Sequence, residues 1–336
     1  MVHKVKQQLR VEDKFYITRK QISVIISFVL RFSENTYPVY LILNQPNHTI
    51  IMKSISMALT LLTVVMACQP SKKESGEATA PKLTQKWETD TLLTTCESVL
   101  YDKQNNILYV ANINGAPEGK DGNGFISKVT LDGKIENLKW ATDMDAPKGL
   151  GIFKNILYVA DINRIHEVDI TTGKIIKSHT VDSAKFLNDV TVSETGKVYI
   201  SDTGNDNILL LENGKVSVWL EGMVGINGLL AEGNNIQVIS FSSGVFSTVD
   251  ENKKITILSD SLDNGDGINA VGDGGYLVSS WNGMVHYVSA DGKNTQLLDT
   301  RKDSVSAADI EYIAEKKLLL VPTFFKNKVV AYELSR

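Results

Sequence analysis

Six polar side chains recur at nearly constant spacing from residue 97 onward, each near the start of a short apolar run: Glu97, Lys148, Asn188, Asn227, Asp266 and Asp309. Consecutive members are 51, 40, 39, 39 and 43 residues apart, so a repeating fold would bring them to equivalent positions. The carboxylates and amide oxygens of Glu97, Asn188, Asn227 and Asp266 are donors that hard divalent cations prefer. We therefore expect a metal ion there, with Ca²⁺ favoured and Mg²⁺, Mn²⁺ or Zn²⁺ as alternatives. Zn²⁺ is less favoured because no His or Cys cluster accompanies the set.

The same residues have a second interpretation, which is conformational. The pairs Asn188-Asp189, Asn227-Gly228 and Asp266-Gly267 are turn-forming sequences, and a repeat with recurring turns would also space them evenly. Glu97 favours the metal interpretation because Glu-Ser-Val is not a turn sequence. An acid that opens an apolar strand requires a partner.

The elements that must position these residues are short strands. Six β-branched, apolar runs begin at Leu108, Leu157, Val198, Gln237, Tyr276 and Leu318, with intervals of 49, 41, 39, 39 and 42 residues. The first interval is longer because residues 114–124 form a Gly-rich insertion. Further strands flank each run, and about four strands in about 40 residues is typical of a β-propeller blade. The sequence therefore predicts an all-β, six-bladed β-propeller over residues 82–336, whose innermost strands present the polar residues to the mouth of a central channel.

The two ends of this region predict how the ring closes. The last repeat stops at its third strand, residues 328–334, while a lone strand-like segment, residues 83–89, precedes the first repeat. Pairing of these two segments would complete the sixth blade and leave no open edge between blades.

Four short segments resemble signature segments of the gluconolactonase/regucalcin (senescence marker protein) family: Cys96-Glu97-Ser98-Val99, Phe186-Leu187-Asn188-Asp189-Val190, Ile226-Asn227-Gly228-Leu229 and Gly265-Asp266-Gly267-Ile268. The resemblance implies a six-bladed propeller with a divalent metal in its channel. By position, it implies Glu97, Asn227 and Asp266 as metal ligands and Asn188 as a further ligand or a substrate contact. One departure concerns Phe186, which stands where regucalcin-like lactonases carry an Arg, and this leaves the substrate class open.

These observations support two main functional hypotheses. The first is a metal-dependent hydrolase of lactones or similar cyclic esters, in which Asp266 or a metal-bound hydroxide activates the nucleophile and Lys148 and Asp309 orient the substrate. The alternative is a non-catalytic binding propeller, because residues 159–165 and 200–208 resemble NHL-repeat strands. A carrier or sensor of a sugar-derived ligand is a third option. Streptogramin lyases are related propellers, but His166, His179 and His286 fall on outer strands and match none of their catalytic histidines.

The N-terminal region predicts export and a lipid anchor. Residues 52–67 have a basic start and an apolar run too short to span a membrane, which is typical of a signal peptide. Residues 65–68 resemble a bacterial lipobox, so we expect Cys68 to be lipidated and residues 68–81 to be a flexible tether. We interpret residues 1–51 as lying upstream of the true start, Met52. The expected location is extracytoplasmic, lipid-anchored in the bacterial cell envelope.

Composition excludes some partners. The chain has 35 Lys and Arg against 39 Asp and Glu, so no basic surface for nucleic acid is predicted. We expect a small-molecule substrate or ligand in the channel, and a membrane contacted through the lipid anchor. With Cys68 lipidated, the second cysteine, Cys96, is a lone buried thiol without a disulfide partner.

Overall fold

The computed structural model describes residues 11–13, 16–18, 21–32, 35–43 and 81–336. The chain divides into two units, residues 1–77 and residues 78–336, and each is described by itself. In the first unit, strand β3 pairs antiparallel with three others; the four strands are β1 (Val11–Asp13), β2 (Tyr16–Thr18), β3 (Gln21–Phe32) and β4 (Asn35–Leu43). The predicted signal peptide, Cys68 and all of the tether except Pro81 lie outside the described residues. Among the helices of the described ranges, none is long and apolar enough to cross a membrane.

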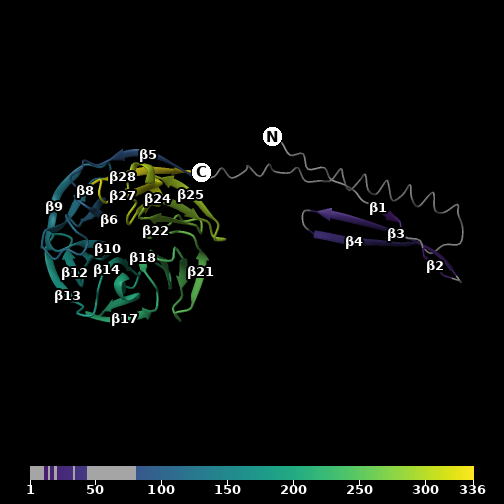
Figure 1. Cartoon of the computed structure of the whole chain (residues 1–336), viewed down its shortest axis with the longest axis horizontal. Helices are drawn as coiled ribbons and strands as arrows, with labels where there is room; N and C mark the ends of the chain where they lie inside the picture. Colours follow the sequence, from purple (N-terminus) through teal and green to yellow (C-terminus); the bar gives the residue numbers. More distant parts are fainter. Residues whose placement is uncertain (1–10, 14–15, 19–20, 33–34, 44–80) are drawn as a thin grey trace. The chain divides into compact units, whose positions relative to one another are not determined.

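The second unit is a six-bladed β-propeller, as predicted, made of six four-stranded antiparallel sheets (Figure 1). In five of the six sheets the strands follow chain order from the channel to the rim. The first three blades consist of β6 (Cys96–Asp102), β7 (Ile107–Asn112), β8 (Gly124–Val129) and β9 (Ile135–Met144); β10 (Pro147–Phe153), β11 (Ile156–Asp161), β12 (Arg164–Asp169) and β13 (Ile175–Thr180); and β14 (Leu187–Val192), β15 (Val198–Asp202), β16 (Asn207–Glu212) and β17 (Lys215–Glu221).

The remaining blades repeat the same order, except that the last one takes its outer strand from the start of the propeller. They consist of β18 (Ile226–Glu232), β19 (Asn235–Ser240), β20 (Phe246–Val249) and β21 (Ile255–Ser259); β22 (Gly265–Ala270), β23 (Tyr276–Ser280), β24 (Met284–Val288) and β25 (Asn294–Asp299); and β26 (Glu311–Ile313), β27 (Leu318–Pro322), β28 (Val329–Ser335) and β5 (Lys82–Glu88). Three 3₁₀ turns lie between strands: η1 (Thr203–Asn205), η2 (Arg301–Asp303) and η3 (Ala314–Lys316).

The predicted closure of the ring is confirmed. Strand β5 lies beside β28 (Figure 1). The two strands pair antiparallel, with Leu83 opposite Leu334 and Trp87 opposite Ala331. An ion pair of 2.9 Å between Lys86 Nζ and Glu333 Oε2 crosses the same pair of strands. The sixth blade is thus built from both ends of the propeller and covers what would be an open strand edge.

The hydrophobic core is divided among the six interfaces between neighbouring blades. One buried cluster packs Tyr109 and Ile126 of the first blade against Leu157 and Val159 of the second. The other five interfaces hold equivalent clusters. Alternate residues of each middle strand therefore face opposite neighbours, which is why these strands are apolar along their whole length.

Near the axis the inner strands approach one another so closely that only glycine fits beside several channel residues. Gly149, Gly228 and Gly267 each follow a polar channel residue. The first two lie against the backbone of the next inner strand, and Gly267 lies against residues 309–310, just before β26. A Cβ atom on Gly149 would lie 2.5 Å from Asp189 Cα, and one on Gly228 would overlap the Asp266 carbonyl oxygen. These glycines therefore fix how near the polar residues come to one another.

Gly228→Ala is expected to destabilise the propeller by about 3 kcal/mol, because the backbone of β22 must move to admit the new methyl group. Urea unfolding measures this change. Gly115→Ala is the matched control, since a Cβ there would meet its nearest neighbour at an ordinary 3.7 Å. Equal free energies of unfolding for the two variants would show that the backbone at the axis moves to admit the methyl group without an energetic cost.

Candidate functional site

Five of the six predicted residues meet in one cavity of about 360 Å³: Glu97, Lys148, Asn188, Asn227 and Asp266. Each is the second residue of the inner strand of its blade, and each is at most 6% exposed. The pairing of the first and second strands shifts register at this point in all five blades. Such a bulge turns a side chain away from the regular alternation of a strand, and it explains how a residue within an apolar strand reaches the channel.

Asp309 lies elsewhere. It lines a second cavity of about 270 Å³, together with Asp189 and residues further along the inner strands. Strand β26 begins only at Glu311, and the Asp309 amide donates instead to the Glu97 carbonyl, at 3.0 Å. Its carboxylate accepts a hydrogen bond of 2.5 Å from Ser98 Oγ. The structure therefore places Asp309 below the floor that the other five residues form, although the repeat spacing aligned it with them.

Two oxygens in the first cavity are buried and have no hydrogen-bond partner: Glu97 Oε2 and Asn188 Oδ1. Some neighbouring groups are paired with each other or with the backbone. Asn227 Nδ2 donates to Asp266 Oδ1 at 2.8 Å, and Thr203 Oγ1 donates to the Ile226 carbonyl at 2.6 Å. Buried polar atoms in native proteins are nearly always paired, so these two oxygens are positions for an ordered water or for a bound ligand.

Burial dominates the electrostatics of the cavity. It raises the pKa of Glu97 well above its ordinary value, and nearby Asp266 and Asp309 raise it further. The pKa of Asp266 is also raised well above its usual value by burial and by Asp309, although the hydrogen bond from Asn227 opposes the shift. Negatively charged carboxylates this close together repel one another, which raises their pKa values. A bound cation would offset this repulsion.

Lys148 is the one basic side chain among the residues that line this cavity. Burial lowers its pKa to about 8, while Glu97 acts in the opposite direction. Its Nζ donates to the Ala146 carbonyl at 3.0 Å and lies 4.4 Å from the centre of the Phe186 ring. The ammonium group is thus held in place on one side of the floor.

The donor types fit a hard divalent cation. Two carboxylates and two amide oxygens converge from four blades, and two of these oxygens are free of other partners. No group of three His, Cys, Asp or Glu side chains with metal-binding geometry occurs within the described residues. A cation at this floor would therefore depend on the amide oxygens of Asn188 and Asn227 as well as on the acids.

The walls of the cavity are aromatic and aliphatic, and sequence reasoning missed all of them except Phe186: Ile113, Pro117, Phe241, Trp281, Phe324 and Phe325. Ile113, Phe241 and Trp281 directly follow the second strand of their blades. In the sixth blade, one residue separates the end of the second strand from Phe324. That shared position is the signal that could have identified them. Asp189 was also missed: its buried carboxylate accepts from the Leu229 amide at 2.5 Å and so joins β14 to β18.

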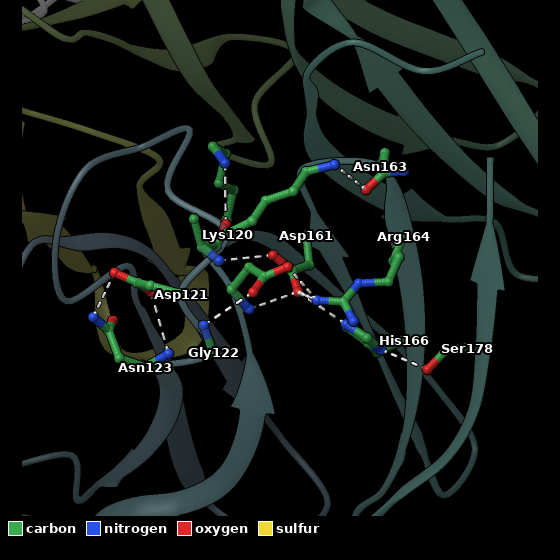
Figure 2. A network of polar contacts seen from close by, with 12 residues as sticks. Lys120, Asp121, Gly122, Asn123, Asp161, Asn163, Arg164, His166 and Ser178 are labelled. Carbon is green, nitrogen blue, oxygen red and sulfur yellow. Dashed lines mark hydrogen bonds and ion pairs between the residues drawn. The ribbon is translucent and has the colours of Figure 1, made fainter. Parts of the chain in front are cut away.

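The Gly-rich insertion, residues 114–124, contributes Pro117 to the wall and is attached to the second blade. The Gly122 amide donates to Asp145 Oδ1 at 3.0 Å, and Lys120 Nζ donates to Asn163 Oδ1 at 3.1 Å (Figure 2). Arg164 Nη2 donates in turn to Asp145 Oδ2 at 2.6 Å. The predicted loop insertion is therefore a fixed part of the cavity wall.

Asp161 is the centre of this network (Figure 2). Its fully buried carboxylate accepts from the amides of Asp145 and Ala146, at 2.8 and 2.7 Å, and interacts with Arg164 and His166, both at 3.0 Å. Because the Ala146 carbonyl receives the Lys148 ammonium, Asp161 indirectly positions Lys148. His166 also contacts Ser178 on the outermost strand, and that Ser-His-Asp series lies outside the cavity-lining set.

The pKa of Asp161 makes stability depend on pH in the acid range. Burial raises this pKa, but the hydrogen bonds from His166, Asp145 and Ala146 outweigh it and lower the value to about 2. A depressed pKa contributes stability above the unfolded-state value, and that contribution is lost as pH falls from about 4 to about 2.

We expect Asp161→Asn to lose about 2 kcal/mol relative to wild type at pH 7 and progressively less as the pH approaches 2. Urea unfolding at pH 7, 4 and 3 measures the difference. The buried acids whose pKa is raised give stability the opposite dependence on pH. Both proteins contain these acids, so their contribution cancels in the difference between the two free energies of unfolding. A difference that stays constant over this range would contradict the assigned role.

The three histidines considered above lie away from the cavity. His166 is on β12, His179 on β13 and His286 on β24, and none is among the cavity-lining residues that the structure describes. His179 Nε2 contacts Glu167 Oε1 at 2.6 Å on the outer part of its blade.

Comparison with solved structures shows the same fold at low sequence identity. A gluconolactonase from Xanthomonas campestris has a TM-score of 0.57 and 14% identity, covering 72% of this chain and 86% of that one. A catalytically inactive virginiamycin B lyase from Staphylococcus aureus, solved with quinupristin, has a TM-score of 0.55 and 13% identity, covering 76% and 100%. A nidogen/laminin complex includes a chain with a TM-score of 0.51 and 14% identity, covering 60% and 79%.

Neither a protein-family profile nor any curated protein sequence matches this chain. The structural neighbours thus include enzymes of two kinds, a lactonase and a lyase, and a chain from a protein–protein complex. At these sequence identities, the similarity establishes only that the chains share the propeller fold.

Proposed function

We propose that this protein is a divalent-metal-dependent hydrolase of lactones or similar cyclic esters, with Ca²⁺ as the favoured metal. The observation that carries the proposal is the pair of buried, unpartnered oxygens, Glu97 Oε2 and Asn188 Oδ1, in the floor shared with Asn227 and Asp266. The resemblance of the surrounding segments to gluconolactonases supports the same assignment.

Glu97, Asn188, Asn227 and Asp266 would hold the cation. When bound, such an ion polarises a carbonyl group and lowers the pKa of water. Asp266 is the catalytic residue of the proposal: its carboxylate lines the cavity floor beside the other cation ligands and would accept a proton from the attacking water. The hydrogen bond from Asn227 Nδ2 keeps its carboxylate oriented for that transfer.

Lys148 and Asn188 would bind the substrate. The Lys148 ammonium is fixed by the Ala146 carbonyl and can stabilise negative charge that develops on the carbonyl oxygen. Asp309 lies in the neighbouring cavity and touches the floor through the backbone of Glu97, so any effect on substrate orientation would pass through that contact.

We further propose that the enzyme is an extracytoplasmic lipoprotein anchored in the cell envelope through Cys68. Mass spectrometry of the N-terminal peptide from the native host tests this. A diacylated or triacylated peptide that begins at Cys68 is expected, and a peptide from residues 1–51 would contradict the assigned start at Met52.

A second candidate function is non-catalytic binding of a ligand or protein partner by an NHL-type propeller. Phe186 favours it, because it replaces the Arg of regucalcin-like lactonases with an apolar ring. In that case the polar floor would only stabilise the channel.

A panel of lactones, assayed with Ca²⁺, Mg²⁺, Mn²⁺, Zn²⁺ and a chelator, separates the two functions. If the protein is the proposed hydrolase, it turns over at least one lactone of the panel. Both the chelator and Asp266→Ala should abolish that turnover. Stoichiometric bound metal without turnover of any lactone would favour the binding function.

A further inference from the structure

The cavity has two chemically different parts. Its floor carries the polar side chains of the inner strands, whereas its walls are the apolar set of Ile113, Pro117, Phe186, Phe241, Trp281, Phe324 and Phe325. Thr203 is the one further polar residue among those that line it, and its hydroxyl already donates to the Ile226 carbonyl. A ligand that fills the cavity therefore meets most of its hydrogen-bonding side chains at the floor, and in the walls only the Trp281 indole N–H and the Thr203 hydroxyl.

Three of the wall residues form a compact aromatic cluster, Trp281, Phe324 and Phe325. Their rings meet edge to face, with centroids 5.5 Å apart for Trp281 and Phe324, 6.0 Å for Trp281 and Phe325, and 4.7 Å for Phe324 and Phe325. Phe324 is 4% exposed and has a φ of 51°, a left-handed conformation that is uncommon for a bulky residue. Phe324 also packs in a buried cluster with Ile113 and Ala146, against which Trp281 lies, and this packing holds the aromatic cluster in place.

Phe325 differs from its neighbours because it is 61% exposed while it lines the cavity. An aromatic side chain in that position leaves a large apolar surface in water when the site is empty. A ligand with an apolar group would cover it, and edge-to-face aromatic contacts add to the gain from burial.

We propose that the site selects a lactone or ester with an apolar substituent, an alkyl chain or an aromatic ring, and discriminates against polyhydroxylated sugar lactones. The carbonyl group would lie at the floor near Lys148 and the substituent against the cluster of Trp281, Phe324 and Phe325. A sugar lactone would place several hydroxyl groups against walls in which only the Trp281 indole N–H and the Thr203 hydroxyl can pair with them, and unpaired buried hydroxyls weaken binding. This inference rests on the proposed function for the reacting carbonyl, but ligand preference is measured without turnover.

Two lactams that resist hydrolysis and share a six-membered ring test the preference: δ-decanolactam, with a pentyl substituent, and glucono-δ-lactam, with hydroxyl groups. Binding to the full chain in Ca²⁺ buffer is followed by calorimetry and by tryptophan fluorescence. We expect δ-decanolactam to bind at least about tenfold more tightly. Phe325→Ala should weaken its binding about three- to tenfold and leave the binding of glucono-δ-lactam unchanged.

Ile257→Ala is the matched control, since Ile257 is 65% exposed and does not line the cavity. Equal or tighter binding of glucono-δ-lactam, no binding of either probe, or equal effects of Phe325→Ala and Ile257→Ala would each overturn the inference. Apolar preference in a protein that hydrolyses no lactone would sustain it and refute the proposed function instead. Tighter binding of glucono-δ-lactam together with metal-dependent turnover of lactones would refute this inference and sustain the proposed function.

Discussion

Glu97→Gln is expected to abolish the thermal stabilisation that Ca²⁺ confers on the wild-type protein. At a free Ca²⁺ concentration of about 100 times Kd, a ligand of the folded state raises stability by about 2.7 kcal/mol, or about 5–10 °C in Tm for a domain of this size. The variant should lose this shift because the amide cannot replace the carboxylate as an anionic ligand. Lactone hydrolysis should fall by about a thousandfold, since polarisation by the metal contributes several kcal/mol to the reaction.

The metal-free variant should be at least as stable as the metal-free wild type. Glu97 is a buried acid whose pKa is raised by burial and by Asp266 and Asp309, so its replacement by a neutral amide removes an unfavourable group. Glu311→Gln is the control, because Glu311 lines the second cavity and should keep the full response to Ca²⁺. Differential scanning fluorimetry with Ca²⁺ and with chelator measures both effects. An undiminished Ca²⁺ shift in Glu97→Gln would exclude Glu97 as a ligand.

Removal of β5 is expected to have the largest effect on the fold. A chain that begins at Thr89 lacks the strand that pairs with β28, and it loses the burial of Leu83 and Trp87 in two of the inter-blade clusters. Loss of two large apolar side chains costs about 3–5 kcal/mol, which lowers Tm by about 10 °C. The exposed edge of β28 should also promote association between chains.

A chain that begins at Pro81 keeps β5 and provides the comparison. Calorimetry gives the change in Tm, and light scattering at several concentrations detects edge-to-edge association. If the two chains have the same Tm and remain equally monodisperse, closure through β5 contributes little to stability.

The sequence predicted the fold because each blade repeats the same local pattern. The regular intervals between the apolar runs defined six blades, and the missing last strand located the partner of β28 in residues 83–89. The repeat also brought Glu97, Lys148, Asn188, Asn227 and Asp266 together correctly, because a fixed period places equivalent residues at equivalent depths in the channel. The repeat spacing alone was therefore sufficient to predict that these five residues lie together.

Asp309 shows where periodicity stops being sufficient. Its interval of 43 residues is close to the others, yet β26 starts two residues after it, and its carboxylate interacts with Ser98 in the neighbouring cavity. The placement depends on a backbone contact with Glu97, more than 200 residues away in sequence, which no local pattern encodes.

The aromatic walls were missed for a related reason. Phe241 and Trp281 end apolar runs that resemble ordinary core strands, and only their shared position directly after the second strand of a blade distinguishes them. The attachment of residues 114–124 depends likewise on Asp145 and Arg164, whose contact forms only when the second blade is folded.

A crystal structure of the protein grown with Ca²⁺, with a calcium anomalous difference map, shows whether the channel floor binds the cation. We predict a single strong peak in the channel floor, at about 2.3–2.6 Å from Glu97 Oε2 and Asn188 Oδ1 and within reach of Asn227 and Asp266. A floor without an anomalous peak at saturating Ca²⁺, or one in which Lys148 Nζ contacts Glu97 and fills the position, would contradict it.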